Sequence, residues 1–250
     1  MRKILLKIVA SLIMIAGISL SGCQQINANN PQTEGVKPEI TNPTVRIARE
    51  MKLPRLEGKA TVVMKVNGRS ITIEVDGYNA PITAGNFVDL VQKGVYNGTV
   101  FHRVVKEPQP FVVQGGDPQS ANSNIPVSRL GTGSYIDPQT RQPRYIPLEI
   151  RPEYDETQEN ATPPDIIYSR IVDEPPELKH KYGVIAMARS QMPDSASAQF
   201  YFTLAELPFL DGKYAVFGRV VDGMDVVESI KQGDRIESAE VIAGAENLKR

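Results

Sequence analysis

Residues 101–117 read FHRVVKEPQPFVVQGGD and are the most informative part of the sequence. Its β-branched and aromatic residues fall in two runs separated by prolines, which predicts two short strands joined by a turn. Arg103 lies in the first run, and Gln114 directly follows the apolar group Phe111-Val112-Val113 in the second. If these strands lie side by side, they would form an apolar binding surface with a few fixed hydrogen-bond donors. Such a surface would bind a ligand in which a small apolar group lies next to a polar amide. The alternative is a core hairpin whose arginine only reaches solvent, and this stretch alone does not decide between the two.

Composition narrows the class of protein. The 250 residues are 41% apolar and 23% charged, with a formal net charge of −1, so the chain can bury a core and is not disordered overall. No basic run stands out, and we therefore expect no nucleic-acid partner. The two histidines, His102 and His180, stand in unrelated contexts without metal-ligand spacing. No nucleophile elbow or phosphate-binding glycine loop is present either, so we expect no metal and no cofactor.

The N-terminus carries an export signal. Three basic residues lie within positions 2–7, and the run Ile8–Leu20 that follows is uncharged. This run is shorter than the roughly 20 residues of a membrane-spanning helix but fits a secretory signal peptide. It ends in Leu20-Ser21-Gly22-Cys23, which resembles the lipobox of bacterial lipoproteins. We therefore expect residues 1–22 to be a lipoprotein signal peptide and Cys23 to be lipidated; the alternative is an ordinary signal peptide with a chance cysteine.

This signal predicts where the mature protein lies. Cys23 is the chain's single cysteine, so no internal disulfide can form after export. We expect an exported lipoprotein, anchored to a membrane and facing the periplasm, a lumen or the cell exterior. The polar residues 24–44 predict a flexible tether within a linker that spans residues 23–58. Residues 45–57 are ambiguous, because their apolar side chains either lie against the domain or continue the linker.

The domain that follows, residues 59–250, begins with a β-hairpin. Apolar residues alternate with polar ones from Val62 to Val66 and again from Ile71 to Val75, and Asn67-Gly68 lies between the two runs. This is the strongest short hairpin signal, and the alternation predicts one buried face. From Pro81 to Gly94 the apolar spacing changes to that of a helix, which we expect to cover one opening of a sheet.

A long acidic insertion interrupts the domain at about residues 151–178. It holds eight acidic and two basic residues and two Pro-Pro pairs, so it cannot build a core of its own. We expect a surface excursion with a few docked apolar residues: Ile166, Ile167, Tyr168, Ile171 and Val172.

The remaining segments predict more strands and one more helix. Residues 183–189, 195–204, 215–221 and 236–242 are typical of strands, and a short helix follows Gly223. In the second of these strands, Gln199 and Tyr201 would face one side, with Phe200 and Phe202 on the other. The total of about eight strands and two helices, without βαβ alternation, predicts an all-β fold. We expect a closed eight-stranded antiparallel barrel with a helix over each end.

Three motifs in this order resemble the cyclophilins, the peptidyl-prolyl cis–trans isomerases: FHR…PFVVQGGD, MAR…SASAQF and FLDGKYAVFGRVVDGMDVV. The resemblance runs from about Ala60 to Ile242. The acidic insertion and the linker leucines look most like cyclophilins of cyanobacteria and of the chloroplast lumen. The resemblance implies a barrel capped by helices and an isomerase that acts on X–Pro bonds of exported proteins and assists their folding. It implies proline-containing polypeptides as partners, no cofactor and a monomer.

The resemblance also assigns the site. Arg103 matches the catalytic arginine of the family. The other matching positions contact the bound peptide: Phe111, Val112, Gln114, Ala188, Arg189, Gln199, Tyr201, Phe209, Leu210 and Tyr214.

Four of these positions depart from the most familiar cyclophilin pattern. Val112 replaces a methionine, Tyr201 a phenylalanine, Phe209 a tryptophan and Tyr214 a histidine. Tyr201 matters most, because its hydroxyl would add a polar group to a pocket that binds the proline ring. The alternative function is therefore a non-catalytic cyclophilin that binds and holds a partner protein, although Arg103 and Gln114 favour the enzyme.

Overall fold

The computed structural model describes residues 42–155, 157 and 162–250. Ile40–Arg250 forms one compact unit. The expected signal peptide, Cys23 and the expected tether as far as residue 41 lie outside the described residues. Within the described part, no helix is both long and apolar enough to cross a membrane.

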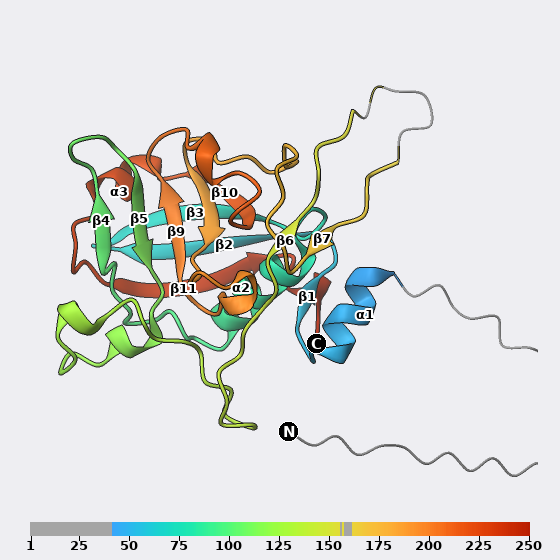
Figure 1. The fold of residues 1–250 in the computed structure, drawn as a ribbon. Coiled ribbons are helices and arrows are strands. Elements are labelled where there is room, and N and C mark those ends of the chain that lie inside the picture. Colours follow the sequence, from blue (N-terminus) through green and yellow to red (C-terminus); the bar gives the residue numbers. More distant parts are fainter. Residues whose placement is uncertain (1–41, 156, 158–161) are drawn as a thin grey trace, which may run out of the picture. The chain divides into compact units, whose positions relative to one another are not determined.

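An antiparallel sheet of eight strands forms the body of this unit (Figure 1). In sheet order the strands are β11 (Ile236–Ala243), β2 (Lys59–Val66), β3 (Arg69–Asp76), β10 (Val216–Asp222), β8 (Val184–Met187), β9 (Phe200–Thr203), β5 (Val112–Gly115) and β4 (Arg103–Val105). Two further pairs are β1 (Arg55–Leu56) with β12 (Leu248–Lys249), and β6 (Glu149–Ile150) with β7 (Ile167–Tyr168). The α-helices are α1 (Pro43–Glu50), α2 (Pro81–Gln92) and α3 (Met224–Ser229). The 3-10 helices are η1 (Pro118–Ala121), η2 (Val127–Arg129), η3 (Pro193–Ser195), η4 (Pro208–Leu210) and η5 (Ala245–Asn247).

The predicted hairpin is confirmed at its turn. Val66 pairs with Arg69, and the two residues between them, Asn67 and Gly68, have φ of 51° and 73°. Two positive φ angles are what a two-residue turn needs to match the twist of its strands. The apolar residues of β2 and β3 are buried on one face, as the alternation predicted.

The barrel is not closed as expected. The sheet is an open half-barrel, because its edge strands β4 and β11 do not pair with each other. A single bridge, Val100 to Arg235, lies between the segments that precede them, where the Ile236 N–H donates to the Thr99 carbonyl at 2.8 Å. The edge at β4 is three residues long and runs into two prolines, which cannot donate to a ladder. β4 is therefore too short to form a continuous ladder of hydrogen bonds with β11 that would close the barrel.

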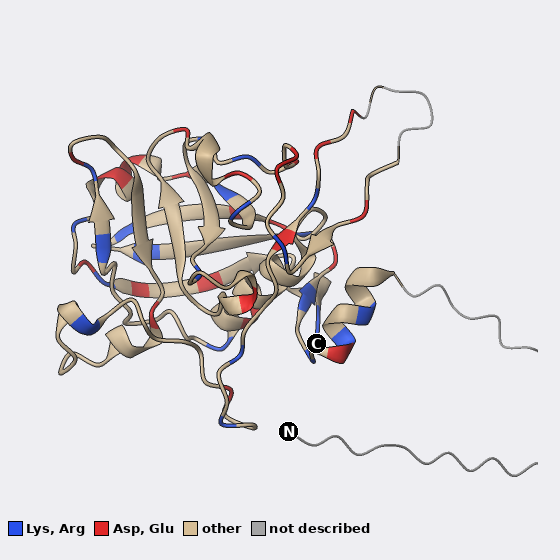
Figure 2. Cartoon of the chain, in the orientation of Figure 1, with Lys and Arg blue, Asp and Glu red and all other residues tan. Residues whose placement is uncertain are grey.

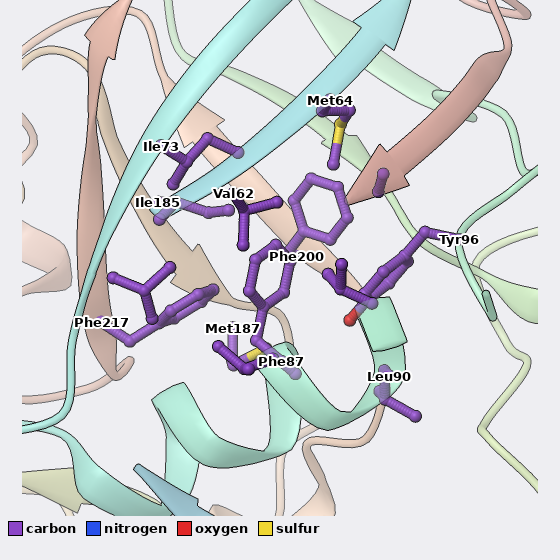
Figure 3. Close-up of a cluster of buried hydrophobic side chains, with 14 of the residues drawn as sticks. Val62, Met64, Ile73, Phe87, Leu90, Tyr96, Ile185, Met187, Phe200 and Phe217 are labelled. Carbon is purple, nitrogen blue, oxygen red and sulfur yellow. The ribbon is translucent and has the colours of Figure 1, made fainter. Parts of the chain in front are cut away.

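The main core lies between the sheet and α2 (Figure 3). Phe200 and Phe202 of β9 enter it, which confirms the predicted alternation along this strand. Phe87 of α2 meets the Phe200 ring edge-on, with centroids 5.6 Å apart, and packs against Phe217 at 5.0 Å. The helix thus covers one opening of the sheet, as its spacing predicted.

The N-terminus of α2 is capped from outside the helix. Ala80 precedes it and offers no side-chain cap. The buried carboxylate of Glu149, on β6, instead accepts from the backbone N–H groups of Ile82 and Thr83, at 3.1 and 2.7 Å. Burial raises the pKa of this carboxyl, while these N–H groups oppose the rise. The Tyr168 hydroxyl also donates to Glu149, at 3.0 Å. Glu149 of β6 therefore binds α2 directly, and Tyr168 of β7 is linked to the helix through it.

The folded unit includes residues that the sequence placed in the linker. The Asn42 side chain accepts from the Thr44 N–H at 2.9 Å and so caps α1. Ala48 and Leu53 are buried in the main core, and the Thr44 hydroxyl lies 2.7 Å from that of Tyr168. The segment from Pro43 to Leu56 therefore packs against the domain.

The acidic insertion is held at its base. β6 and β7 pair across it, Val172 is buried, and Ile167 packs against the small cluster around Val172. Ile171 is 46% exposed, so it does not dock as expected. Acidic residues lie on both arms of this excursion (Figure 2).

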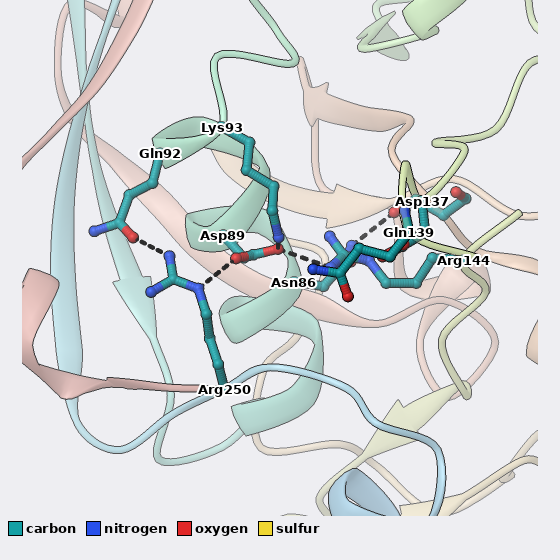
Figure 4. A network of polar contacts seen from close by, with 9 residues as sticks. Asn86, Asp89, Gln92, Lys93, Asp137, Gln139, Arg144 and Arg250 are labelled. Atoms are coloured by element: carbon teal, nitrogen blue, oxygen red, sulfur yellow. Dashed lines mark hydrogen bonds and ion pairs between the residues drawn. The ribbon is translucent and has the colours of Figure 1, made fainter. Parts of the chain in front are cut away.

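A second buried carboxylate, Asp89 on α2, fastens distant parts of the chain (Figure 4). Its two oxygens accept from Lys93 at 2.5 Å, Arg144 at 2.7 Å and Arg250 at 2.8 Å. Burial alone would raise the pKa of Asp89, but these hydrogen bonds hold it below its ordinary value of 3.8. One carboxylate thus joins α2, the loop before β6 and the last residue of the chain.

Candidate active site

A cavity of about 220 Å³ brings together most of the predicted site. Its lining residues come from β4, from β5 and the residue before it, from the segment after β8, from β9, and from η4 and the segment after it: Arg103, Phe111, Val112, Gln114, Ala188, Arg189, Tyr201, Leu210 and Tyr214. The two other predicted residues adjoin it, since Gln199 contacts Gln114 and Phe209 contacts Phe111.

A chain of polar side chains runs along one side of the cavity. Arg103 of β4 lies directly opposite Gln114 of β5, and its Nη1 donates to the Gln114 Oε1 at 3.3 Å. The Gln114 amide donates to Gln199 at 3.2 Å, and Gln199 donates to the Gly133 carbonyl at 2.9 Å. The Arg103 guanidinium lies 5.4 Å above the Phe111 ring centre. Across the described part of the chain, no carboxylate comes within ion-pair distance of Arg103, so its charge is unneutralised.

The opposite side of the cavity is apolar. Val112 and Tyr201 belong to a separate buried cluster, against which Phe111 and Leu210 pack. Phe209 is 58% exposed and stacks on Phe111, with centroids 6.0 Å apart and planes 16° from parallel. The exposed rim and the buried floor are therefore both aromatic.

The Tyr201 hydroxyl does not add the polar group that the sequence predicted for the pocket. Tyr201 is 5% exposed, and its hydroxyl lies 2.9 Å from Nε2 of His180, a residue that does not line the cavity. Burial raises the pKa of this phenol, so it stays protonated. The Tyr214 ring meets Tyr201 edge-on at 6.1 Å. The pocket therefore presents ring carbon to a ligand.

Arg189 is held at the rim by its neighbours. Its guanidinium lies 4.7 Å from the Tyr214 ring centre, its Nε donates to the Lys213 carbonyl at 2.8 Å, and Nη1 donates to the Ser190 carbonyl at 2.8 Å. The N–H of Ala188 donates to the Gln199 carbonyl at 2.9 Å, which extends the pairing of β8 and β9.

A second cavity, of about 360 Å³, adjoins the first. The two cavities share Gln114, Ala188 and Arg189. The second is completed by Gly131, Thr132, Gly133, Ser134, Tyr145, Ser190, Ser195, Ser197 and Gln199.

The histidines lie outside both cavities. His102 is buried, and burial lowers its pKa; its ring lies against Gly131. His180 lies behind Tyr201, a position that no sequence spacing indicated. Among the described residues, no three His, Cys, Asp or Glu side chains gather as metal ligands would.

Comparison with known proteins decides the family. The sequence model described as cyclophilin type peptidyl-prolyl cis-trans isomerase/CLD matches residues 61–246. The chain belongs to this family. A peptidyl-prolyl cis-trans isomerase of Helicobacter pylori is 32% identical over 191 residues, which are 76% of this chain and 91% of that protein.

Two longer cyclophilins are more similar in sequence. A putative thylakoid lumen peptidyl-prolyl cis-trans isomerase of Synechocystis is 41% identical over 211 residues, 78% of this chain and 50% of that protein. The chloroplastic isomerase CYP38 of Arabidopsis thaliana is 38% identical over 218 residues, 78% of this chain and 45% of that protein. The matched part thus spans about half the length of these two relatives.

Solved cyclophilin structures share the fold. AquaCyp293 of Hirschia baltica has a TM-score of 0.51 at 23% identity, covering 78% of this chain and 79% of that one. A Cryptosporidium parvum cyclophilin, crystallised in the presence of the dipeptide Ala-Pro, has a TM-score of 0.50 at 24% identity. It covers 73% of this chain and 99% of its own.

Proposed function

We propose that this chain is a peptidyl-prolyl cis–trans isomerase that acts on X–Pro bonds of exported proteins and assists their folding. One observation carries the proposal: an unneutralised guanidinium, Arg103, lies at an apolar cavity of about 220 Å³ beside the amide of Gln114. The relatives in the thylakoid lumen and the chloroplast support action on exported chains.

The chemistry follows from the amide bond. Rotation about X–Pro is slow because resonance resists twisting, with a barrier of about 20 kcal/mol. In the twisted state the prolyl nitrogen regains its lone pair, and Arg103 then donates a hydrogen bond to it. Such a bond exists only in the transition state, so it lowers the barrier without tightening ground-state binding.

The remaining residues hold the substrate during rotation. Phe111, Val112 and Leu210 contact the proline ring, while the other side of the amide turns. Gln114 fixes Arg103 from the neighbouring strand, at 3.3 Å. No step of this mechanism requires an acid, a base, a nucleophile or a cofactor.

We also propose that the N-terminus anchors the domain. Export would be followed by lipidation of Cys23, with the tether after it leading to α1. Mass spectrometry of the mature N-terminus tests this: a diacylglyceryl cysteine is expected. An unmodified peptide that contains Cys23 would contradict it.

A protease-coupled assay with a prolyl tetrapeptide tests the activity itself. The purified folded unit from residue 42 to residue 250 should accelerate cis-to-trans conversion in proportion to its concentration. Peptide binding without acceleration would instead favour the non-catalytic alternative, in which the groove holds a partner protein.

A further inference from the structure

One wall of the proline cavity is not built on the sheet. Phe209 and Leu210 belong to η4, a single 3-10 turn between β9 and β10. A turn this short has few internal hydrogen bonds to fix its side chains. Something outside the turn must therefore hold this wall at the correct distance from β5 and β9.

The backbone of His180 binds both ends of that turn. The Leu207 N–H, which precedes η4, donates to the His180 carbonyl at 2.8 Å. At the other end, Oδ1 of Asp211 accepts from the His180 N–H at 2.7 Å. Leu207 and Asp211 flank the turn directly, so one residue fixes its start and its end.

The His180 side chain extends the same arrangement to the floor of the cavity. Its Nδ1 lies 2.8 Å from Oδ1 of Asp211 and its Nε2 lies 2.9 Å from the Tyr201 hydroxyl. A carboxylate only accepts, so Nδ1 carries the proton and Nε2 accepts from the phenol. The imidazole and phenol rings are also stacked, with planes 15° from parallel. The fully buried His180 side chain thus joins the turn to β9.

We propose that His180 is a positioning residue for the proline cavity: through Asp211 and Tyr201 it fixes the spacing between the wall on η4 and the floor on β9. This inference rests on the proposed function, since it concerns how the same cavity binds proline. It also gives Tyr201 a reason to carry a hydroxyl, because phenylalanine would leave Nε2 of a buried imidazole without a partner.

Two variants separate the two side-chain hydrogen bonds of His180, the Asp211 arm at Nδ1 and the Tyr201 arm at Nε2. An asparagine side chain places its amide near the Nδ1 position, so His180→Asn keeps the bond to Asp211 and loses the bond to Tyr201. A glutamine reaches the Nε2 position, so His180→Gln keeps the Tyr201 arm and loses the Asp211 arm. Because Asp211 holds the turn, we expect His180→Gln to raise KM about tenfold, with kcat changed less than about threefold; the loss of one buried hydrogen bond is of this size. His180→Asn should raise KM less.

The control separates positioning from general stability. Ile73→Val shortens a fully buried core residue of β3, outside both cavities, and should lower Tm while KM stays unchanged. Methyl NMR of Leu210 gives a second measurement that needs no turnover: its resonance should shift in His180→Gln and not in Ile73→Val. If both His180 variants keep the KM of the wild type and the Leu210 resonance does not move, the proposal is overturned. A wild-type protein that accelerates no prolyl peptide would instead overturn the proposed function, and the Leu210 shift would still report on His180.

Discussion

Arg103 and Arg144 both lie over aromatic rings, yet their surroundings suit opposite tasks. The Arg103 guanidinium lies 5.4 Å from the Phe111 centroid, and that of Arg144 lies 4.6 Å from the Tyr135 centroid. Arg103 is exposed and donates to a neutral amide at 3.3 Å. Arg144 has a side chain only 10% exposed, and it donates to the buried carboxylate of Asp89 at 2.7 Å.

This difference separates a group that acts on substrate from one that supports the fold. The charge of Arg144 is compensated by Asp89, and its removal would leave that carboxylate with fewer partners. Among the residues that the structure describes, Arg103 has no such carboxylate partner, and it borders the cavity, so its donors are available to a bound amide. Removing Arg144 should therefore lower stability and leave turnover unchanged, whereas removing Arg103 should lower turnover and leave stability unchanged.

The largest effect on stability is expected from removing Asp89, which binds Lys93, Arg144 and Arg250. Asp89→Ala leaves Lys93, Arg144 and Arg250 without their shared carboxylate, and breaking a buried ion pair by removing one partner costs about 3–5 kcal/mol. Urea unfolding should show this loss, while kcat/KM per folded molecule stays near the wild-type value. A variant as stable as the wild type would show that the network contributes little.

Next in size is the effect of removing Arg103. Arg103→Ala should lower kcat/KM by about 10²–10³-fold, or about 2.7–4 kcal/mol, taking the loss of an oxyanion-hole donor as a guide. Its Tm should stay close to that of the wild type, because an exposed side chain contributes little to stability. Arg144→Ala is the matched control and should show the reverse, with lower Tm and unchanged kcat/KM. If both variants lose stability and activity together, the distinction between the two arginines fails.

The sequence predicted the local elements because their signals are local, whereas the site residues came from the resemblance to the cyclophilins. Alternation around Asn67-Gly68 was sufficient for the first hairpin, and the run from Arg103 to Gln114 was sufficient for two paired strands. The Asp89 network could not be predicted, since Arg144 and Arg250 lie far from α2 in sequence. The same holds for His180, whose partners Tyr201 and Asp211 come from two other segments. The prediction of a closed barrel was wrong, because the number of strands alone does not show that β4 is too short to pair with β11.

A smaller effect is expected at the rim of the cavity. Cyclophilins that bind cyclosporin tightly carry a tryptophan at the position of Phe209, whose ring here has no N–H to donate. A lost hydrogen bond of this kind costs about 1–3 kcal/mol, so the wild type should bind the drug about 10–100-fold more weakly than Phe209→Trp. Turnover should change little, since Phe209 stacks on Phe111 at the exposed rim. Equal, tight inhibition of both forms would show that another residue decides drug binding.

The smallest effect concerns acid. Burial raises the pKa of the Asp89 carboxyl, but its hydrogen bonds lower it more, so the pKa lies below the ordinary value of 3.8. A carboxyl with a lowered folded-state pKa stabilises the fold above its unfolded pKa, and this contribution is lost as the pH falls through the folded value. The difference in unfolding free energy between wild type and Asp89→Asn should therefore be constant near neutral pH. It should shrink below pH 3.8, by at most about 1.4 kcal/mol per pH unit. A difference that does not vary with pH would mean that the pKa of Asp89 is the same in the folded and the unfolded protein.

On the proposed mechanism, Arg103 stabilises the twisted amide and does not contribute to ground-state binding of the peptide. Exchange NMR of a labelled X–Pro peptide tests it most directly, because it measures cis–trans interconversion on the protein separately from affinity. With wild-type protein, cis and trans signals should exchange rapidly, and resonances of the residues that line the 220 Å³ cavity should shift. With Arg103→Ala the peptide should bind with similar affinity, while exchange falls by about 10²-fold or more. Equal exchange rates with the two proteins would show that Arg103 does not stabilise the twisted amide.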